Sequence, residues 1–270
     1  MDFIQTLILA VVQGITEFLP ISSSGHLILT SQFLGWPDQG VTFDLALNVG
    51  TLLAVVIYFR RDVGVIIRDT LLSLLRRQKV GTSSLGWFIA FATIPAGLFG
   101  LLLMDHIDNL RQSDAMAWII LFTTVFYAVL LWASDKYGKK IKPMEKMTFK
   151  NAMIIGLAQA LALIPGTSRS GVTITAGLFL GYDFKTASRF SFLMAIPVIF
   201  LATAVKITDD ALSLDNLPWG EFFLGFVISF VTAMLAIHYF LKWLERFGMM
   251  PYVLYRFALA GVLLAFILMK

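Results

Sequence analysis

Six apolar stretches, each long enough to cross a lipid bilayer, restrict the fold more than any other feature of this chain. They lie at 41–59, 85–104, 115–134, 190–207, 221–241 and 252–269. A helix of about 20 residues spans a hydrocarbon core of about 30 Å. Because 58% of the residues are hydrophobic and only 14% are charged, a water-soluble globule is excluded. The sequence predicts an all-α integral membrane protein with six transmembrane helices, in which residues 1–270 form a single membrane domain.

Basic residues are concentrated in four of the connections between these stretches. Sixteen of the 21 lysines and arginines lie in 60–84, 135–150, 182–189 and 242–251. The connections 105–114 and 206–219 each hold one basic residue and three aspartates. Loops rich in lysine and arginine remain in the cytoplasm. The four basic connections are therefore predicted to be cytoplasmic, and the other two connections and both chain termini are predicted to lie outside.

Two further apolar regions, 3–35 and 151–181, are each interrupted midway by proline, serine and glycine. The interruptions are Pro20–Gly25 and Pro165–Gly171. Region 151–181 begins after one predicted cytoplasmic loop and ends before another, so it has to enter the membrane and return on the same side. An arm of about 16 helical residues is roughly 24 Å long, enough to pass the midplane. Both regions are predicted to be re-entrant helical hairpins that enter from opposite faces.

The two interrupted regions resemble each other at an offset of 146 residues. The matches are Gln13 with Gln159, Ser22 with Ser168, Ser24-Gly25 with Ser170-Gly171, Ile28 with Ile174, and Leu34-Gly35 with Leu180-Gly181. Each region is followed by three predicted spans, so the second copy starts on the opposite side of the membrane. This pattern predicts an inverted-topology repeat of 1–134 and 151–270, whose broken helices meet near the midplane. Chance similarity among common membrane residues is the alternative.

Three ionisable residues inside the apolar zones, Glu17, His26 and Arg169, all belong to the interrupted regions. Such residues are functional candidates because charge is costly in a bilayer. Gln13 and Glu17 are four residues apart and share a helical face, so their oxygens could hold a hard divalent cation or orient a water. A structural ion pair between Glu17 and Arg169 is the alternative. His26 is a candidate acid, base or nucleophile.

Hydroxyl groups surround these charges in both interruptions. They belong to Ser22, Ser23 and Ser24 in the first interruption and to Ser168 and Ser170 in the second. A planar guanidinium, hydroxyls and the free amides of a helix start are phosphate ligands, so the two interruptions together predict a cradle for a diphosphate. Packing hydroxyls are the alternative for each serine. Arg256 and Lys270 are expected to be interfacial anchors.

The residues of both interruptions resemble the bacterial undecaprenyl-diphosphate phosphatase family of the bacitracin-resistance type. The stretch 13–26 is similar to its first signature, and 165–173 is similar to its second. The resemblance implies an enzyme of the bacterial inner membrane that hydrolyses undecaprenyl diphosphate to the monophosphate and so recycles the lipid carrier of peptidoglycan synthesis. It also implies a divalent cation, Mg²⁺ or Ca²⁺, and a site open to the periplasm, the side on which both termini are predicted.

Roles can be carried over from the family by position. The resemblance assigns metal and water to Gln13 and Glu17, catalysis to Ser23, His26 and Arg169 as well as Glu17, and phosphate binding to Ser22, Ser24, Ser168, Ser170 and Thr173. Some family members carry glutamate where this chain has Gln13. The nucleophile remains open among Ser23, His26 and water. The partners implied are a polyprenyl diphosphate and the bilayer without nucleic acid, and a homodimer is compatible with the sequence. The rival function is a transporter or polyprenyl-phosphate translocase.

Overall fold

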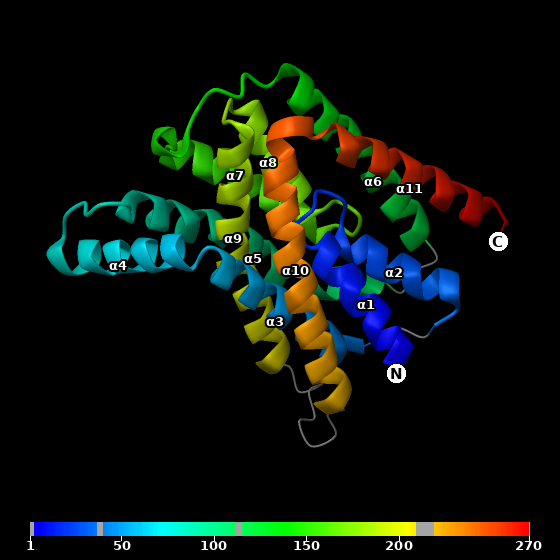
Figure 1. Cartoon of the computed structure of the whole chain (residues 1–270). Helices are drawn as coiled ribbons and strands as arrows, with labels where there is room; N and C mark the ends of the chain where they lie inside the picture. Colours follow the sequence, from blue (N-terminus) through cyan, green and yellow to red (C-terminus); the bar gives the residue numbers. More distant parts are fainter. Residues whose placement is uncertain (1–2, 37–39, 112–114, 209–218, 270) are drawn as a thin grey trace.

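The computed structural model describes residues 3–36, 40–111, 115–208 and 219–269, and the chain is helical over most of them (Figure 1). The helices are α1 (Phe3–Thr16), α2 (Ser23–Leu34), α3 (Gly40–Tyr58), α4 (Arg60–Arg76), α5 (Ser83–Arg111), α6 (Met116–Tyr137), α7 (Phe149–Ala160), α8 (Arg169–Phe179), α9 (Phe184–Thr208), α10 (Trp219–Phe247) and α11 (Met250–Met269). In the described residues, β pairing is limited to one bridge between Lys142 and Tyr182. The all-α prediction is confirmed.

Five helices, α5, α6, α9, α10 and α11, are long and apolar enough to cross a membrane. Helix α3 meets the same criterion only together with α4, from which it is bent by 82°. The described chain thus has five or six candidate spans, one at each apolar stretch singled out in the sequence. The prolines that interrupt 3–35 and 151–181 separate shorter helices, α1 from α2 and α7 from α8. The predicted class of integral membrane protein is confirmed.

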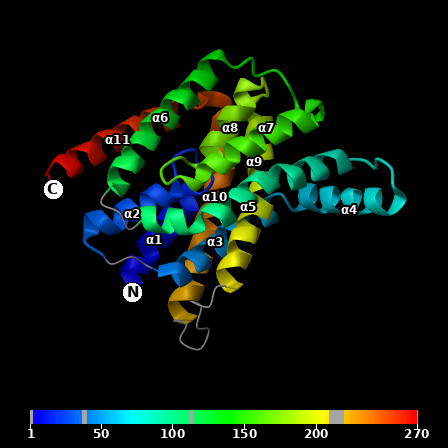
Figure 2. The same cartoon turned by 180° about the vertical axis from the view of Figure 1, so that it is seen from behind.

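Helix α4 lies where a loop was predicted at 60–84, and that prediction is wrong for Arg60–Arg76. The helix is amphipathic, with Leu71, Leu74 and Leu75 exposed and Ser73 buried, where the Oγ of Ser73 accepts a hydrogen bond of 3.0 Å from Trp87 Nε1. Both views show α4 beside the start of α5, extending away from the central helices (Figures 1 and 2). Its arginines lower the average hydropathy, so a search for spans overlooks it.

Helices of the first half of the chain pack against helices of the second half. Helix α10 lies against α1 and α3, α9 lies against α3, α7 lies against α5, and α11 lies against α6 (Figures 1 and 2). Each of these pairs joins a helix before residue 138 to a helix after residue 148. The first arm of each interrupted region, α1 or α7, therefore packs on a long helix of the other half.

A glycine brings each of these first arms close to its partner helix. A Cβ atom at Gly14 of α1 would lie 1.8 Å from Thr232 Oγ1 of α10. A Cβ atom at Gly156 of α7 would lie 2.3 Å from the carbonyl oxygen of Ala92 in α5. Small residues permit such close packing, which drives helix association where lipid removes the hydrophobic advantage. These two contacts hold α1 and α7 against their partner helices. The turns that follow α1 and α7 contain the candidate site.

Candidate active site

The turns after the two first arms have the same unusual backbone. Ser22 and Ser168 precede α2 and α8 with φ angles of 75° and 73°, in the left-handed region that residues other than glycine rarely adopt. Each serine side chain accepts a hydrogen bond from a backbone amide three residues on, of Gly25 at 3.3 Å and of Gly171 at 3.1 Å. Strained residues of this kind cluster at functional sites. The residues matched at an offset of 146 thus have equivalent conformations.

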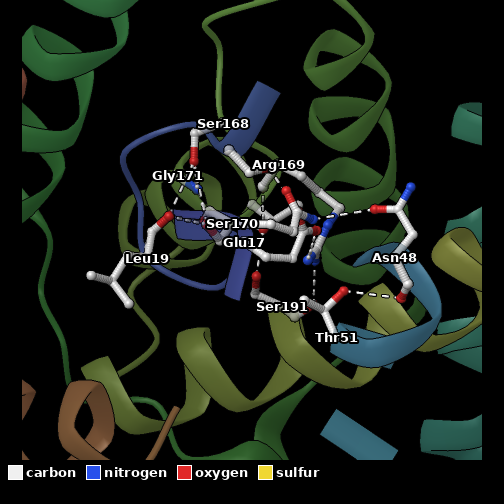
Figure 3. A network of polar contacts seen from close by, with 12 residues as sticks. Glu17, Leu19, Asn48, Thr51, Ser168, Arg169, Ser170, Gly171 and Ser191 are labelled. Atoms are coloured by element: carbon white, nitrogen blue, oxygen red, sulfur yellow. Dashed lines mark hydrogen bonds and ion pairs between the residues drawn. The ribbon is translucent and has the colours of Figure 1, made fainter. Parts of the chain in front are cut away.

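The two turns also bind each other directly. Ser170 Oγ donates to the carbonyl oxygen of Leu19 at 2.8 Å, and Ser168 Oγ lies 3.5 Å from the same oxygen (Figure 3). A Cβ atom at Gly25 would lie 3.7 Å from the Cα atom of Gly166, so the backbones approach closely. The predicted meeting of the two interruptions is therefore found in the structure.

The Glu17 carboxylate is the centre of a polar network between the turns. Oε1 accepts a hydrogen bond of 3.1 Å from Arg169 Nη2 (Figure 3). Oε2 accepts hydrogen bonds from Ser23 Oγ at 2.7 Å and from Gln13 Nε2 at 3.0 Å. The side chains of Glu17 and Arg169 are each only 11% exposed, so little solvent weakens this ion pair. A hydroxyl held against a carboxylate that two further groups orient is the geometry of an activated nucleophile.

Arg169, the first residue of α8, is itself held from three directions. Besides Glu17, it contacts the carbonyl oxygen of Ser191 through Nη1 at 3.4 Å (Figure 3). Its guanidinium lies 5.8 Å from the ring centroid of Phe18, within the range of a cation–π interaction. The Thr173 hydroxyl lies 2.7 Å from the Ser191 hydroxyl and donates to the Arg169 carbonyl. Thr173 thus supports the helix turn that presents Arg169.

A small cavity of about 100 Å³ opens beside Glu17. Its lining residues are Gln13, Glu17, Ser23, Ser24, Leu27, Asp44 and Asn48. Asp44 and Asn48 come from α3 and received no role in the sequence analysis, and Gln13 donates a hydrogen bond of 3.2 Å to Asn48 Oδ1. Their spacing of four residues in an otherwise apolar helix is the signal that could have identified them. The cavity wall is rich in oxygen atoms.

Several predicted site residues do not line this cavity. His26 uses both ring nitrogens, at 2.7 Å from the Ser22 carbonyl and at 2.7 Å from Tyr255 Oη, and its ring stacks on Tyr255. The hydroxyls of Ser22, Ser168, Ser170 and Thr173 form hydrogen bonds within or between the turns. The structure therefore brings Gln13, Glu17, Ser23 and Ser24 to the cavity wall, joins Arg169 to them through Glu17 without its lining the cavity, and places the other predicted residues around them.

Arg256 of α11 is not an interfacial anchor, because its side chain is 0% exposed and lies beneath both turns. Its guanidinium donates to the carbonyl oxygen of Pro20 in the first turn and to those of Gly166 and Thr167 in the second. Two more bonds go to backbone carbonyls of α6. Buried arginine persists only with such partners. It lies in the buried stripe formed by Val253, Arg256, Ala260 and Leu263, a spacing the sequence contains.

The fold and this cluster define a class of helical membrane protein whose carboxylate, hydroxyl and guanidinium groups meet inside the helix bundle. The family model of the bacitracin resistance protein BacA matches residues 6–262. The chain is 57% identical to a protein of Marinobacter nauticus named undecaprenyl-diphosphatase, over 98% of this chain and 99% of that one. A protein of the same name from Idiomarina loihiensis is 54% identical, over 97% and 98% of the two chains. The chain belongs to the BacA family, as its two motifs predicted.

Proposed function

We propose that this protein is a phosphatase of the bacterial inner membrane that hydrolyses undecaprenyl diphosphate to undecaprenyl phosphate and inorganic phosphate. The family, the names of its relatives and the apolar helices support this activity. The observation that carries the proposal is the short contact between Ser23 Oγ and the Glu17 carboxylate, beside a guanidinium. The product of the reaction, undecaprenyl phosphate, is the lipid carrier that returns to peptidoglycan synthesis. This recycling accounts for resistance to bacitracin.

The two interrupted regions are re-entrant in this proposal, and 1–134 and 151–270 form an inverted repeat. The matching backbone of Ser22 and Ser168 and the crossed packing of the halves support that arrangement. The basic connections 60–84, which contains helix α4, and 135–150 face the cytoplasm, so both termini are periplasmic. The cavity lies against the outer part of α3, at Asp44 and Asn48, which favours an opening to the periplasm.

Ser23 is the nucleophile of the proposed reaction. Its hydroxyl gives its proton to Glu17 Oε2 while Oγ forms a bond to the terminal phosphorus of the diphosphate. The bond between that phosphorus and the bridging oxygen breaks, and undecaprenyl monophosphate leaves with the proton from Glu17. A base whose oxygen lies 2.7 Å from the hydroxyl oxygen that carries the proton contributes about 10²–10⁴-fold to such a step.

Water completes the reaction at the phosphoserine. The water oxygen bonds to phosphorus and gives a proton to the Glu17 carboxylate. The bond from phosphorus to Ser23 Oγ breaks, and Oγ takes that proton from Glu17 as inorganic phosphate leaves. Arg169 neutralises charge that develops on the phosphoryl oxygens, and a preorganised cation in a buried site is worth several kcal/mol for this task. The contacts of His26 with Ser22 and Tyr255 favour a positioning role over attack on phosphorus.

A divalent cation, Mg²⁺ or Ca²⁺, belongs to the proposal. The cavity offers the carboxylates of Glu17 and Asp44 and the amide oxygens of Gln13 and Asn48, the hard oxygen donors that these ions prefer. In the described part of the chain, no group of three or more His, Asp and Glu side chains could hold a metal, so amide oxygens would complete the ligand set. Such an ion would neutralise the phosphate oxygens as a Lewis acid.

The test is release of inorganic phosphate from undecaprenyl diphosphate by the purified protein in detergent, with and without chelator. Detergent abolishes compartments, so a pure transporter or translocase would release none. Ser23→Ala is expected to reduce release at least 10²-fold, and Ser24→Ala, which removes a neighbouring hydroxyl assigned to phosphate binding, is expected to reduce it less. Equal activity of Ser23→Ala and the parent protein would exclude Ser23 as the nucleophile, and absence of release from the parent would exclude the phosphatase.

A further inference from the structure

A second and larger cavity, of about 450 Å³, lies outside the catalytic site. Its lining residues are Tyr58, Phe59, Asp62, Lys185, Arg189, His238, Leu241, Lys242, Leu244 and Glu245. They come from the end of α3, the start of α4, the start of α9 and the last third of α10. This volume is within the range of ligand sites, about 300–1,000 Å³.

The charged groups of this cavity leave cations without partners. Arg189 Nη2 forms a salt bridge of 2.7 Å with Asp62. The side chains of Lys185 and Lys242 make no ion pair or hydrogen bond with the described residues, although both line the same cavity. Glu245 is the second carboxylate of the lining. Three cations against two carboxylates leave an excess of positive charge in a concave site, where the field is focused on an anion.

The other walls of this cavity are apolar and continue into candidate membrane spans. Phe59 and Leu244 are 5% and 1% exposed and form its inner surface. Lys242 lies ten residues beyond Thr232, whose hydroxyl faces Gly14 of α1, so it is roughly 15 Å further along α10. The cavity thus lies where the apolar length of α10 gives way to a charged end. A membrane lipid likewise has an apolar tail next to a charged headgroup, so it can contact both the apolar wall and the charged end. A free ion gains no binding energy from apolar walls.

A cluster of phenylalanines separates this cavity from the catalytic site. The Phe192 ring lies 5.3 Å from that of Phe18, which follows Glu17 and contacts Arg169, and 6.3 Å from that of Phe59, which lines the cavity. Phe240 packs on Phe192 at 5.5 Å. Phe18, Phe192 and Phe240 are buried. A ligand in the second cavity is therefore held apart from Ser23 and the Glu17 carboxylate.

We propose that this cavity binds the phosphate headgroup of an anionic phospholipid from the leaflet at the predicted cytoplasmic face. Lys185 and Lys242 supply the unpaired positive charge, and the apolar wall formed by Phe59, Leu241 and Leu244 contacts the first carbons of the acyl chains. The Arg189–Asp62 salt bridge keeps one wall of the cavity in place. Hydrolysis at the other site does not require this lipid to leave, because the phenylalanine cluster lies between them.

The test measures binding of a short-chain phosphatidylglycerol to the full-length protein in a neutral detergent. Lys185→Gln with Lys242→Gln is expected to weaken the dissociation constant at least tenfold. The matched control is Lys139→Gln with Lys150→Gln, and it is expected to change the constant less than twofold. It removes the same charge from two exposed lysines of the connection 135–150, predicted on the same face, of which Lys150 lies in the first turn of α7. Phosphate release by all three proteins is expected to be equal, which shows that each is folded.

Competing ligands distinguish a phospholipid from other phosphates. Inorganic phosphate at the same concentration is expected not to displace the lipid, and polyprenyl monophosphate is expected to bind no more tightly than phosphatidylglycerol. Displacement by inorganic phosphate would overturn the proposal in favour of a simple anion site, and preference for polyprenyl monophosphate would overturn it in favour of a product site. Equal weakening by the pocket pair and the control pair would show that only the overall charge of the face matters.

Discussion

The two interrupted turns share a backbone conformation but differ in what their side chains do. In the first turn, Ser23 and Glu17 face the cavity, and the hydroxyl is hydrogen-bonded to the carboxylate. In the second turn, the hydroxyls of Ser168 and Ser170 point to the Leu19 carbonyl of the first, and only the Arg169 side chain enters the network. In the proposed mechanism, one turn thus supplies the reacting groups, and the other holds them in place and adds positive charge. A repeated local structure does not imply a repeated function.

Replacing the carboxylate of the first turn is expected to have the largest effect. Glu17→Gln keeps the size of the side chain but removes the base for Ser23 and the partner of Arg169, so phosphate release is expected to fall at least 10³-fold, about 4 kcal/mol of transition-state stabilisation. The measurement is the initial rate in detergent at saturating substrate. Gln13→Glu is the control, and it is expected to keep activity. Loss of less than tenfold in Glu17→Gln would contradict the role of Glu17 as base.

Replacing Arg169, the guanidinium of the second turn, is expected to have the next largest effect. Arg169→Lys keeps the charge but loses the planar fork that reaches both Glu17 and the Ser191 carbonyl, so kcat is expected to fall about 10²-fold. Arg169→Ala is expected to abolish turnover while the protein remains folded in the membrane. Comparison of kcat with KM for the lysine variant separates loss of transition-state charge stabilisation from loss of substrate binding. A change confined to KM would mean that Arg169 only binds the lipid.

A smaller effect is expected from the hydroxyls that join the turns. Ser170→Ala removes the donor of the 2.8 Å bond to the Leu19 carbonyl, so the free energy of unfolding is expected to fall by about 1–2 kcal/mol. Thermal unfolding in detergent measures this loss. Phosphate release below the unfolding temperature is expected to fall less than in Ser23→Ala. If Ser170→Ala is as inactive as Ser23→Ala but as stable as the parent, the hydroxyl of Ser170 acts on substrate.

The glutamines at matched positions should show the smallest effect and the clearest contrast. Gln13 bonds to Glu17 and Asn48, whereas the amide of Gln159, which is 1% exposed, has no hydrogen-bond partner among the described residues. Gln159→Leu is therefore expected to leave both activity and stability unchanged or slightly raised, because an unpaired buried amide is costly. Gln13→Leu is expected to slow hydrolysis about tenfold. Equal sensitivity of both positions in the same rate assay would mean that the two arms have equivalent roles.

The sequence predicted the parts of the site that depend on order along the chain. Hydropathy located the six apolar stretches, and the placement of proline, serine and glycine located both interruptions. The proximity of Glu17 and Arg169, which are 152 residues apart, followed from the predicted meeting of the two interruptions, and the ion pair that they form was the alternative considered for Glu17. These inferences succeeded because the bilayer restricts helix length and penalises unpaired charge, and both restrictions are visible in a single sequence.

The parts that sequence did not predict depend on how helices are rotated about their axes. Arg256 lies near the start of an apolar helix, where arginines commonly extend to the interface, and only the packing of α11 on α6 turns it inward. Asp44 and Asn48 were visible as polar residues, but hydropathy does not show which face of α3 meets Gln13. Helix α4 was missed because its arginines hide an amphipathic pattern in the average. The rotation of a helix about its axis, and the surface against which its amphipathic face packs, are set by tertiary contacts.

The hydrogen bonds that Arg256 donates to both turns have a consequence for the order in which the protein assembles. Residues 1–179 contain every group assigned to the chemistry, yet the guanidinium that ties Pro20 to Gly166 arrives with the last helix. The two turns are therefore joined by this guanidinium only when α11 is packed on α6. A chain without α11 lacks the five hydrogen bonds that Arg256 donates to backbone carbonyls of the two turns and of α6, so fewer contacts hold its two turns together.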